Sequence, residues 1–522
     1  MAQRISDIPS KTASYILAHD TGTGGNKAVL TDLKGRILHS AYLPYPLLHP
    51  RPGWAEQDPD LLWRAVTRTT RTVLKETGVD PAQVLGVGIS AQMFNILPVD
   101  EHGRPLTPML SWLDLRSVGQ ADALLQQIGG PFFFQHSGNI PTAKDIIPKI
   151  VWLRERQPEV WARTHKLLDC KEYILFRLTG RLATDWHGAS VYFLLDPYQK
   201  AWSEPLCSRL GIPLEMLPPA YPCTTVIGEV TPRAARETGL RAGTPVVACA
   251  GDVAVAQMGA GAVHDGRAHL CIGTATWVGL STSVFRNDPQ RPFWGLSHID
   301  PHKWIIAGEM ETGGGALMWF RDTLCQEETR RAKRVGLSAY QLLSEIAGGI
   351  SPGADGLLFL PWLSGERSPV LDHYLRGAFV GLSLGHTKAH MTRAVMEGVA
   401  FHLRWICEAL EGLGFQVTSL NSIGGGSTSP TWTQIISDVT GCTLRVAAHP
   451  LEAGAMGAAL TVAVGLGIYP DAEAVDALIP FSHTVEPAEG RAPRYDALYR
   501  EYRALYEATA PIFRRLHEVS DS

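Results

Sequence analysis

The stretch from Tyr15 to Asp32 reads Tyr-Ile-Leu-Ala-His-Asp-Thr-Gly-Thr-Gly-Gly-Asn-Lys-Ala-Val-Leu-Thr-Asp and decides the expected fold. Its two apolar runs flank a turn rich in glycine and threonine, and a Lys-Gly pair then leads into a third run from Ile37 to Tyr45. Apolar runs of this length, separated by glycine, are typical of strands joined by tight turns. The segment therefore predicts a β-meander.

The segments that follow add helices to this sheet. A helical pattern begins near Asp58-Pro59-Asp60, where Asp and Pro favour a helix start, and Val84 to Ser90 is a further apolar strand. Such mixing of strands and helices predicts α/β layers. An amphipathic helix that packs on its own domain is predicted near the C-terminus from apolar residues spaced three and four apart: Tyr495, Leu498, Tyr499, Tyr502, Leu505 and Tyr506.

A second strand–turn–strand segment occurs about half a chain later. Ala268 to Ile272 and Thr276 to Ser281 are apolar runs on either side of Gly273-Thr274. This Gly-Thr pair lies 251 residues after Gly22-Thr23, in a chain of 522 residues. The spacing predicts two related domains that each contribute one Gly-Thr hairpin to a shared cleft, although Gly-Thr is common enough to recur by chance.

Length and charge narrow the class of protein. A chain of 522 residues is too long for one hydrophobic core, so at least two domains are expected. Lys and Arg number 47 against 51 Asp and Glu, which gives a net charge of -4. Without a basic excess that could follow a phosphate backbone, nucleic acid is not expected as a partner.

The chain also lacks the usual marks of export. Residues 1 to 7 show no charged start followed by an apolar run, so no secretory signal is predicted. The longest uncharged apolar stretch, Ala453 to Tyr469, is short for a membrane span and predicts a packed interior helix. Eight scattered cysteines suit neither zinc nor a disulfide framework, and they favour a cytoplasmic location.

The first glycine-rich turn is a candidate phosphate site. Backbone N–H groups can approach phosphate closely at such turns, and a carboxylate at a strand end, here Asp20, can hold hydrated Mg²⁺. Neither a P-loop nor a Gly-x-Gly-x-x-Gly fingerprint occurs. The alternative is a tight hairpin whose glycines only supply turn geometry.

A second carboxylate has the same placement. The apolar run that starts at Thr244 ends in Gly-Asp252, and the pKa of a carboxylate in apolar surroundings tends to rise. A raised pKa suits a general base near neutral pH. The alternative role of Asp252 is the N-cap of a helix over Val253 to Met258.

A third glycine-rich segment lies downstream. Gly424-Gly425-Gly426-Ser427 precedes a helical run from Trp432 to Thr440. Such glycines would let a flat ligand such as adenine approach the backbone. A flexible loop accounts for the composition about equally well.

Taken together, these residues resemble the FGGY carbohydrate kinases, and within them the xylulokinase branch. The most specific match is Gly377-Ala-Phe-Val-Gly381-Leu382 followed by His390-Met391 and Ala394-Val-Met-Glu397. Pro361-Trp-Leu-Ser-Gly-Glu-Arg-Ser-Pro369 is also typical of the family. The motifs lie in order from about residue 15 to residue 460, so the resemblance covers nearly the whole chain.

The resemblance implies a two-domain, actin-like or ribonuclease-H-like α/β fold closing over a central cleft, with domains at residues 1–258 and 259–522. It implies that Asp252 is the catalytic base and that Asp20 and Asp252 serve Mg²⁺. The residues implied for ATP are Gly22, Thr23, Lys27, Gly273, Thr274, Gly425, Gly426 and Ser427. Those implied for the sugar are Gln92, Met93, Phe94, Trp112, Asp114, Arg116 and Asp252. A homodimer is common in the family.

The implied reaction is ATP-dependent phosphorylation of a sugar hydroxyl, D-xylulose to its 5-phosphate. Two positions depart from the xylulokinase pattern: Phe94-Asn95 stands where His-Gly is usual, and Val253 where Asn is usual. Phe94 could stack on a sugar's apolar face, and Asn95 could supply a replacement donor. Two alternatives stay open. The substrate could be another ketose, such as ribulose or a methylpentulose, or a polyol, such as erythritol or glycerol. The chain could also be an actin-like ATPase that acts without a sugar.

Overall fold

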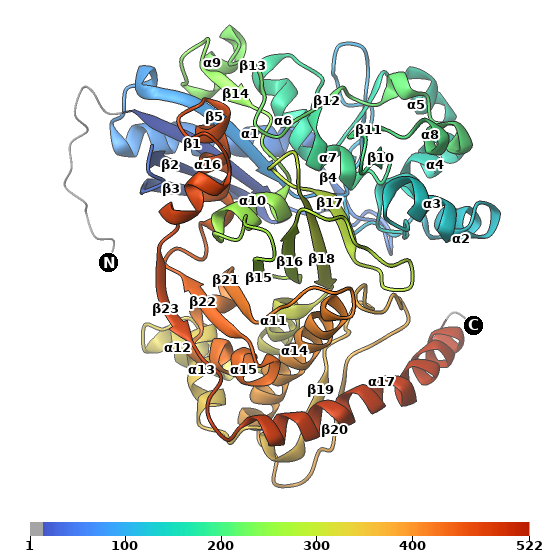
Figure 1. Ribbon diagram of the computed structural model, residues 1–522, viewed down its shortest axis with the longest axis vertical. Helices are drawn as coiled ribbons and strands as arrows, with labels where there is room; N and C mark the ends of the chain where they lie inside the picture. Colours follow the sequence, from blue (N-terminus) through green and yellow to red (C-terminus); the bar gives the residue numbers. More distant parts are fainter. Residues whose placement is uncertain (1–13, 521–522) are drawn as a thin grey trace.

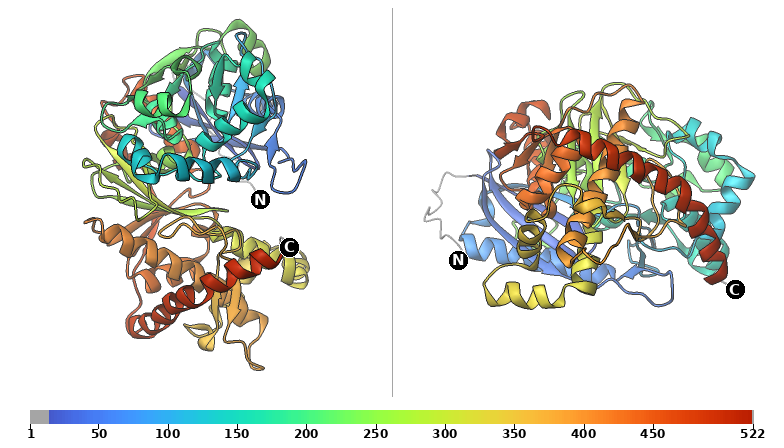
Figure 2. Two further views of the ribbon diagram at one scale, coloured as in Figure 1. Left: turned by 90° about the vertical axis from the view of Figure 1, so that its right-hand side faces the viewer. Right: turned by 90° about the horizontal axis from the view of Figure 1, so that it is seen from below.

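Residues 14–520 are described by the structure, a computed structural model of the chain. They form two lobes, stacked one above the other in Figures 1 and 2, and each lobe is built around a mixed β-sheet. The predicted two-domain α/β architecture is confirmed. Residues 1–7, where no secretory signal is predicted, lie outside the described residues.

The first lobe contains a six-stranded sheet in the order β13-β14-β5-β1-β2-β3. The meander predicted from the first stretch is confirmed, because β1 pairs antiparallel with β2 and β2 with β3. On the other side, β5 runs parallel to β1, and β14 runs parallel to β5. The strands are β1 Tyr15–Gly22, β2 Gly25–Asp32, β3 Ile37–Pro44, β5 Val84–Ala91, β13 Val226–Glu229 and β14 Pro245–Val247.

The second lobe repeats this arrangement in a seven-stranded sheet, in the order β17-β18-β16-β15-β21-β22-β23. Again the first strand, β15, is antiparallel to its hairpin partner β16 and parallel to a later strand, β21. The expectation of two related units is therefore confirmed at the level of strand pairing. The strands are β15 Ala268–Ile272, β16 Thr276–Thr282, β17 Trp294–Ser297, β18 Trp304–Met310, β21 Ser419–Ile423, β22 Thr443–Ala447 and β23 Phe481–Val485.

The helices before residue 240 belong to the first lobe: α1 Pro59–Thr77, α2 Val118–Gln127, α3 Gly130–Ser137, α4 Ile146–Arg156, α5 Pro158–Arg163, α6 Cys170–Thr179, α7 Trp186–Val191, α8 Glu204–Leu210 and α9 Pro232–Thr238. The second lobe carries α11 Gly313–Leu324, α12 Gln326–Arg334, α13 Ala339–Gly348, α14 Lys388–Glu411, α15 Pro430–Thr440 and α17 Ala492–Ser520. As predicted, α1 starts beside Asp58, whose side chain accepts a hydrogen bond from the Asp60 N–H.

Short elements complete the chain. They are the strands β4 Glu56–Gln57, β6 Leu97–Val99, β7 Met109–Leu110, β8 Lys166–Leu168, β9 Thr184–Asp185, β10 Leu195–Asp196, β11 Ala201–Trp202, β12 Ala220–Tyr221, β19 Leu358–Leu360 and β20 Ala378–Val380. The 3₁₀ turns are η1 Pro81–Gln83, η2 Leu214–Met216, η3 Ala354–Gly356, η4 Gly425–Thr428 and η5 Glu473–Leu478.

Two helices join the lobes, α10 Asp252–Gly259 and α16 Ala453–Gly465. They pack against each other, and α16 also lies on β1 and β5 of the first sheet, as Figure 1 shows. Their backbones nearly touch: a Cβ on Gly259 would come within 1.8 Å of the Ala453 carbonyl, and one on Gly457 within 1.9 Å of the Val255 carbonyl. The packed interior helix predicted for the apolar stretch is confirmed.

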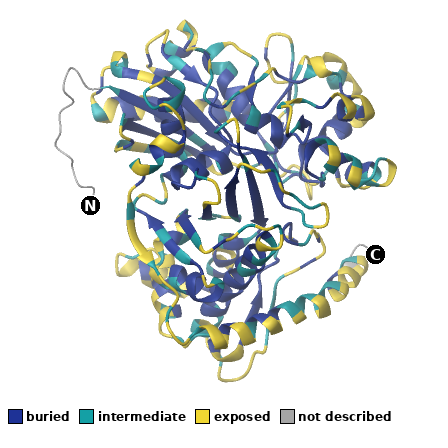
Figure 3. Cartoon of the chain, in the orientation of Figure 1, coloured by how far each residue is buried: buried dark blue, intermediate teal, exposed yellow. Residues whose placement is uncertain are grey.

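Buried residues concentrate in the two sheets and the helices that face them (Figure 3). The C-terminal helix α17 packs on the second lobe as predicted, since Tyr495, Tyr499 and Tyr502 are buried in that lobe's core. All eight cysteines are free, and seven of them are buried. Within residues 14–520, no helix combines the length and apolar character that crossing a membrane requires.

One predicted strand is shorter than expected. The apolar run from Thr244 forms a strand only over β14, because Cys249 adopts a left-handed φ of 58° and the Ala248 and Cys249 N–H groups bond to the loop at residues 223–225. Asp252 is the first residue of α10, and Gly251 is its N-cap. The predicted N-cap role of Asp252 is therefore wrong by one residue.

The helix contact between the lobes predicts a strong steric effect of one methyl group. Gly457→Ala should lower the melting temperature, with a cost of about 1–3 kcal/mol or more, because the added carbon would overlap the Val255 carbonyl of α10. Gly119→Ala is the matched control, since Gly119 is exposed on α2 and has no atom within 4 Å of an added Cβ. Equal melting temperatures for the two variants, measured by calorimetry, would contradict this account of the contact.

Candidate functional site

A cavity of about 230 Å³ lies between the two lobes. Both lobes supply its walls: Gly22, Thr23, Gln92, Met93, Phe94, Trp112, Lys144, Asp252, Val253, Gly273, Thr274, Ala275, Trp277, Trp294, Glu309, Glu311 and Arg367. The structure thus brings together both predicted Gly-Thr turns, Asp252 and most of the predicted sugar residues. The shared cleft expected from the repeat is present.

Each Gly-Thr turn connects two strands at the cavity. In the first, the Thr23 hydroxyl accepts a hydrogen bond from the Trp112 indole N–H at 2.8 Å. In the second, the Thr274 carbonyl accepts from the Gly315 N–H at 2.9 Å, so α11 begins directly against this turn. A Cβ on Gly314 would lie 2.1 Å from the Gly273 carbonyl, which shows how closely the backbones approach. The glycines therefore allow the tight turns and the close approach of neighbouring backbones, and the turns face the cavity.

The carboxylates of Asp20 and Asp252 are near enough for the charge of one to act on the other, and only Asp252 lines the cavity. Asp20 lies near the end of β1, and Asp252 is the first residue of α10, where its Oδ1 accepts from the Val253 N–H at 2.9 Å. Burial raises the pKa of Asp252 to about 7, and the nearby charge of Asp20 adds to the shift. The expected rise is confirmed. A carboxyl with this pKa can accept a proton near neutral pH.

This pair also suits a magnesium ion. Burial raises the pKa of Asp20, while Lys27 opposes the shift. Between residues 14 and 520, no group of three or more His, Cys, Asp or Glu side chains is arranged to hold a metal. Mg²⁺ is commonly held by one or two carboxylates together with water and substrate phosphates, so Asp252 on the cavity wall and the nearby Asp20 fit its preferences.

Lys27 does not line the cavity. Its ammonium donates to the carbonyl of Leu451, just before α16, so it links the first hairpin to the second lobe. The predicted adenosine loop is also outside this cavity. It forms η4 after β21, and a Cβ on Gly426 would meet the Ile272 side chain at 2.3 Å, which places the loop against the end of β15. The buried Ser427 hydroxyl donates to the Ile423 carbonyl at 2.6 Å and so holds the loop itself.

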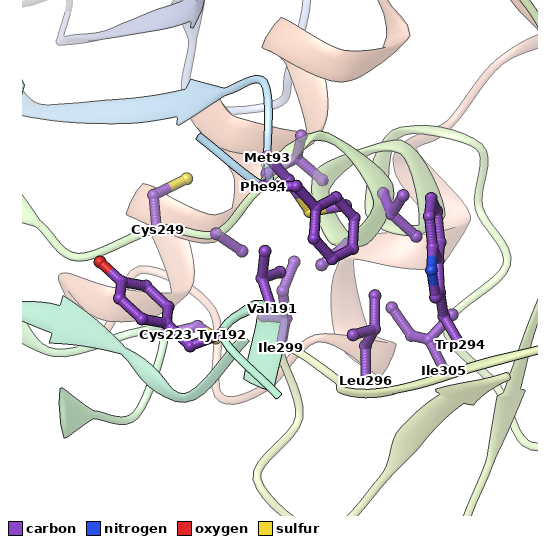
Figure 4. Packing of buried hydrophobic residues seen from close by; sticks show 14 of the residues in the cluster. Met93, Phe94, Val191, Tyr192, Cys223, Cys249, Trp294, Leu296, Ile299 and Ile305 are labelled. Carbon is purple, nitrogen blue, oxygen red and sulfur yellow. The ribbon is translucent and has the colours of Figure 1, made fainter. Parts of the chain in front are cut away.

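Met93, Phe94 and Trp294 are among the apolar residues of the cavity wall. Figure 4 shows them in the packing of buried hydrophobic residues. The ring centroids of Phe94 and Trp294 are 4.9 Å apart. Phe94 has a φ of 62°, which is unusual for a bulky residue. The buried Lys149 ammonium holds this backbone, because it donates to the carbonyl of Phe94 at 2.8 Å and to that of Lys144 at 2.5 Å.

Asn95 does not offer a donor to the cavity, and that expectation is wrong. Its amide nitrogen donates to Asp169 Oδ1 at 2.8 Å and to the carbonyl of Gln92 at 3.2 Å. Its Oδ1 accepts from the Trp112 N–H at 3.1 Å, and the side chain is fully buried. Asn95 instead ties the loop of Phe94 to the segment that carries Trp112.

Asp114 and Arg116 also lie outside the cavity wall. Arg116 Nη2 bonds to Asp114 Oδ2 at 2.8 Å and to Glu56 Oε1 at 2.7 Å, with the guanidinium 3.6 Å from the centre of the Trp54 ring. Arg116 thus packs on the rings of Trp54 and Trp152 outside the cavity lining, and the sugar contacts of these two residues stay a prediction.

Four charged residues of the cavity were not predicted: Lys144, Glu309, Glu311 and Arg367. Glu309 lies near the end of the apolar strand β18 and Glu311 just after it, so the rule that drew attention to Asp20 and Asp252 could have found them. Arg367 lies inside the family-typical segment Pro361–Pro369. Lys144 precedes α4 and carries no sequence signal of its own.

The cationic groups of this set are paired with carboxylates. Lys144 Nζ lies 2.6 Å from Glu311 Oε2, and Arg367 lies 3.3 Å from Asp145 Oδ1 and 3.4 Å from Glu309 Oε2. Burial raises the pKa of Glu309 to about 8, and the neighbouring Glu311 contributes to the shift. The wall therefore carries no excess positive charge.

Comparison with known proteins identifies a family along most of the chain. The N-terminal domain of the FGGY family of carbohydrate kinases matches residues 15–259, and the C-terminal domain of the same family matches residues 268–466. These two ranges contain every cavity residue named above.

Individual relatives divide between two activities. A gluconokinase from Bacillus subtilis is 30% identical over 510 residues, 98% of this chain and 96% of that protein. A xylulose kinase from Staphylococcus epidermidis is 30% identical over 496 residues, 95% of this chain and 97% of that protein. The structure of a ligand-bound xylulose kinase from Lactobacillus acidophilus superposes with a TM-score of 0.88 at 25% identity, covering 96% of this chain and all of that one.

The raised pKa of Asp252 predicts how stability depends on pH. The folded state favours the protonated carboxyl, because the pKa rises from 3.8 to about 7. The stability that protonation contributes is present below pH 3.8 and is lost as the pH rises through 7. The free energy of unfolding of Asp252→Asn should therefore exceed that of the wild type. This difference should grow between these pH values and then stay constant at about 2–4 kcal/mol.

Urea unfolding of the ligand-free protein at several pH values measures this margin. Glu489→Gln removes an exposed carboxylate and should show no such growth with pH. A margin for Asp252→Asn that is the same at pH 4.5 and pH 8 would mean that the carboxyl is not desolvated as described.

Proposed function

Because the chain belongs to the FGGY family of carbohydrate kinases, we propose that it transfers the γ-phosphoryl group of ATP to D-xylulose and forms the 5-phosphate. The observation that carries the proposal is the position of Asp252. Its carboxyl, with a pKa of about 7, lies on the wall of a sugar-sized cavity that both Gly-Thr turns also line. A base for the acceptor hydroxyl and two phosphate-binding turns thus share one space.

In the proposed mechanism Asp252 accepts the proton of the attacking hydroxyl. The Gly22-Thr23 and Gly273-Thr274 turns contact the phosphates from opposite lobes, and the Gly425-Gly426 loop contacts the adenosine. Positioning and electrostatic stabilisation provide most of the catalysis in phosphoryl transfer, so no covalent intermediate with the protein is needed. Asp20 and Asp252 would hold Mg²⁺, which supplies positive charge that stabilises the transferring phosphoryl group.

The location of the cavity between the lobes also favours transfer of the phosphoryl group to the sugar over transfer to water. Phe94, Trp112 and Trp294 give the wall aromatic surfaces, against which the apolar face of a sugar can pack. Closure of the lobes on both substrates would exclude water and so limit hydrolysis of ATP. Asn95 supports this wall from behind, because its Oδ1 accepts from the backbone N–H of Trp112.

The charge of the cavity favours a neutral acceptor. Lys144 and Arg367 already have carboxylate partners in Glu311, Glu309 and Asp145, so a sugar without charge can enter without rearranging them. Gluconate is the second candidate, because a gluconokinase is among the relatives at 30% identity. Other ketoses and polyols fit the same charge argument as xylulose.

The cellular compartment of the reaction can be inferred from the substrate ATP and from the cysteines. ATP is a cytoplasmic substrate, and eight unpaired thiols suit a reducing compartment, so we place the enzyme in the cytoplasm. The homodimer stays a prediction from the family resemblance.

An acceptor panel tests the proposed substrate. With Mg²⁺ and ATP, ADP release should be stimulated most by D-xylulose, weakly by D-ribulose, erythritol and glycerol, and least by D-gluconate. A sugar-free blank measures any hydrolysis of ATP. Strongest stimulation by gluconate would replace the proposed acceptor, and turnover that no sugar stimulates would contradict the transferase assignment.

The role of Asp252 has its own test. Asp252→Asn should lower kcat by about two to four orders of magnitude, because the variant cannot accept the hydroxyl proton. In the wild type, kcat/KM should rise with pH and level off above about 7, where the carboxylate of the free enzyme is ionised. Glu489→Gln should keep wild-type rates. A folded Asp252→Asn variant with near-normal turnover would rule Asp252 out as the base.

A further inference from the structure

We infer that the buried Lys144–Glu311 ion pair is a specificity determinant that makes the cavity select uncharged acceptors and reject those that carry a carboxylate. The inference rests on the proposed function, since it concerns the sugar end of the same cavity. It names two residues to which neither the sequence motifs nor the comparisons assign a role.

The pair spans the two lobes. Lys144 lies between α3 and α4 in the first lobe, and Glu311 lies directly after β18 in the second. Lys144 Nζ and Glu311 Oε2 are 2.6 Å apart, and the side chains are only 8% and 5% exposed. Both residues nevertheless line the cavity, so an acceptor would meet the pair as part of the wall.

The second cation of the wall cannot serve in place of Lys144. The Arg367 guanidinium has Asp145 at 3.3 Å and Glu309 at 3.4 Å, and it also donates to the Thr142 hydroxyl at 3.1 Å. Both positive groups are thus occupied by negative groups of the protein. No ammonium or guanidinium among the described cavity residues is left without a carboxylate neighbour.

An acceptor carboxylate that reaches this part of the wall would meet Glu311 as well as Lys144. Burial alone would raise the pKa of Glu311, but Lys144 and Arg367 hold it below its usual value, so the side chain is ionised at neutral pH. Like charges in a partly desolvated site repel strongly, and an unpaired or repulsive group is a common way to exclude a competing ligand. An uncharged ketose has only hydroxyl and carbonyl groups and avoids this repulsion.

The same geometry gives the two positions opposite effects on selectivity. Without the charge of Glu311, the Lys144 ammonium becomes available to an acceptor carboxylate. Without the charge of Lys144, Glu311 remains and repels that carboxylate more. An ion pair that only fastened the two lobes together would instead affect every acceptor alike. The ratio of kcat/KM for D-gluconate to that for D-xylulose separates these two roles.

The decisive experiment measures this ratio for four proteins. Glu311→Gln should raise it at least ten-fold over the wild type, and Lys144→Met should leave it unchanged or lower it. Glu408→Gln, which alters an ion pair with Arg404 on the far side of the second lobe, is the matched control and should not move the ratio. The ratio for the double variant Lys144→Met/Glu311→Gln should lie between the ratios of the two single variants.

A ratio for Glu311→Gln within two-fold of the wild type, or a rise for Lys144→Met equal to that for Glu311→Gln, would overturn the inference. If Glu311→Gln does not fold, the test is the comparison of Lys144→Met with Glu408→Gln. A ratio that is higher in Lys144→Met than in Glu408→Gln would contradict the inference. Failure of the proposed substrate is seen in the wild type alone, and a wild type that prefers D-gluconate would overturn this inference as well. If the wild type prefers another neutral sugar, that sugar replaces D-xylulose in the ratio.

Discussion

The crossing of α10 and α16 is the contact on which both the fold and the site depend. Helix axes can approach this closely only where neither backbone carries a side chain at the crossing, and here Gly259 and Gly457 meet that requirement. The same crossing positions the chemistry. α10 begins with Asp252, and the start of α16 lies so near Asp20 that a Cβ on Gly454 would be 3.0 Å from Asp20 Oδ2. Packing of small residues thus brings the start of α10, which carries Asp252, and the start of α16, which lies beside Asp20, into one place.

Electrostatics then divides the cavity into two regions. Burial raises the pKa of both Asp20 and Asp252, the charge of Asp20 adds to the shift of Asp252, and the two carboxyls create a place for a proton or a metal ion. Around Lys144 and Arg367 the charges are matched within the protein by Glu311 and Asp145. The first region is prepared for the reaction and the second for recognition, and each depends on burial between the lobes to be effective.

Local patterns predicted the architecture well, because they depend on neighbours in the sequence. The runs beside Gly22-Thr23 and Gly273-Thr274 specify hairpins, and their repetition specifies two similar sheets. The prediction was less successful where long-range contacts override local preference. The run before Asp252 ends early as a strand because Ala248 and Cys249 bond to another loop. Asn95 faces away from the cavity because Asp169, 74 residues later in the chain, accepts its amide N–H. Lys144 acquires its significance only from Glu311, which the chain reaches 167 residues later.

The path of the chain through α16 has a consequence for how the molecule can be assembled. This helix comes from the last fifth of the sequence, yet it covers strands β1 and β5 of the first sheet. A fragment that ended at the close of α10 would therefore leave an apolar face of its sheet exposed to water. The two lobes resemble each other as a duplication would make them, but they are not independent folding units. More than 450 residues must therefore be synthesised before the first lobe can fold completely.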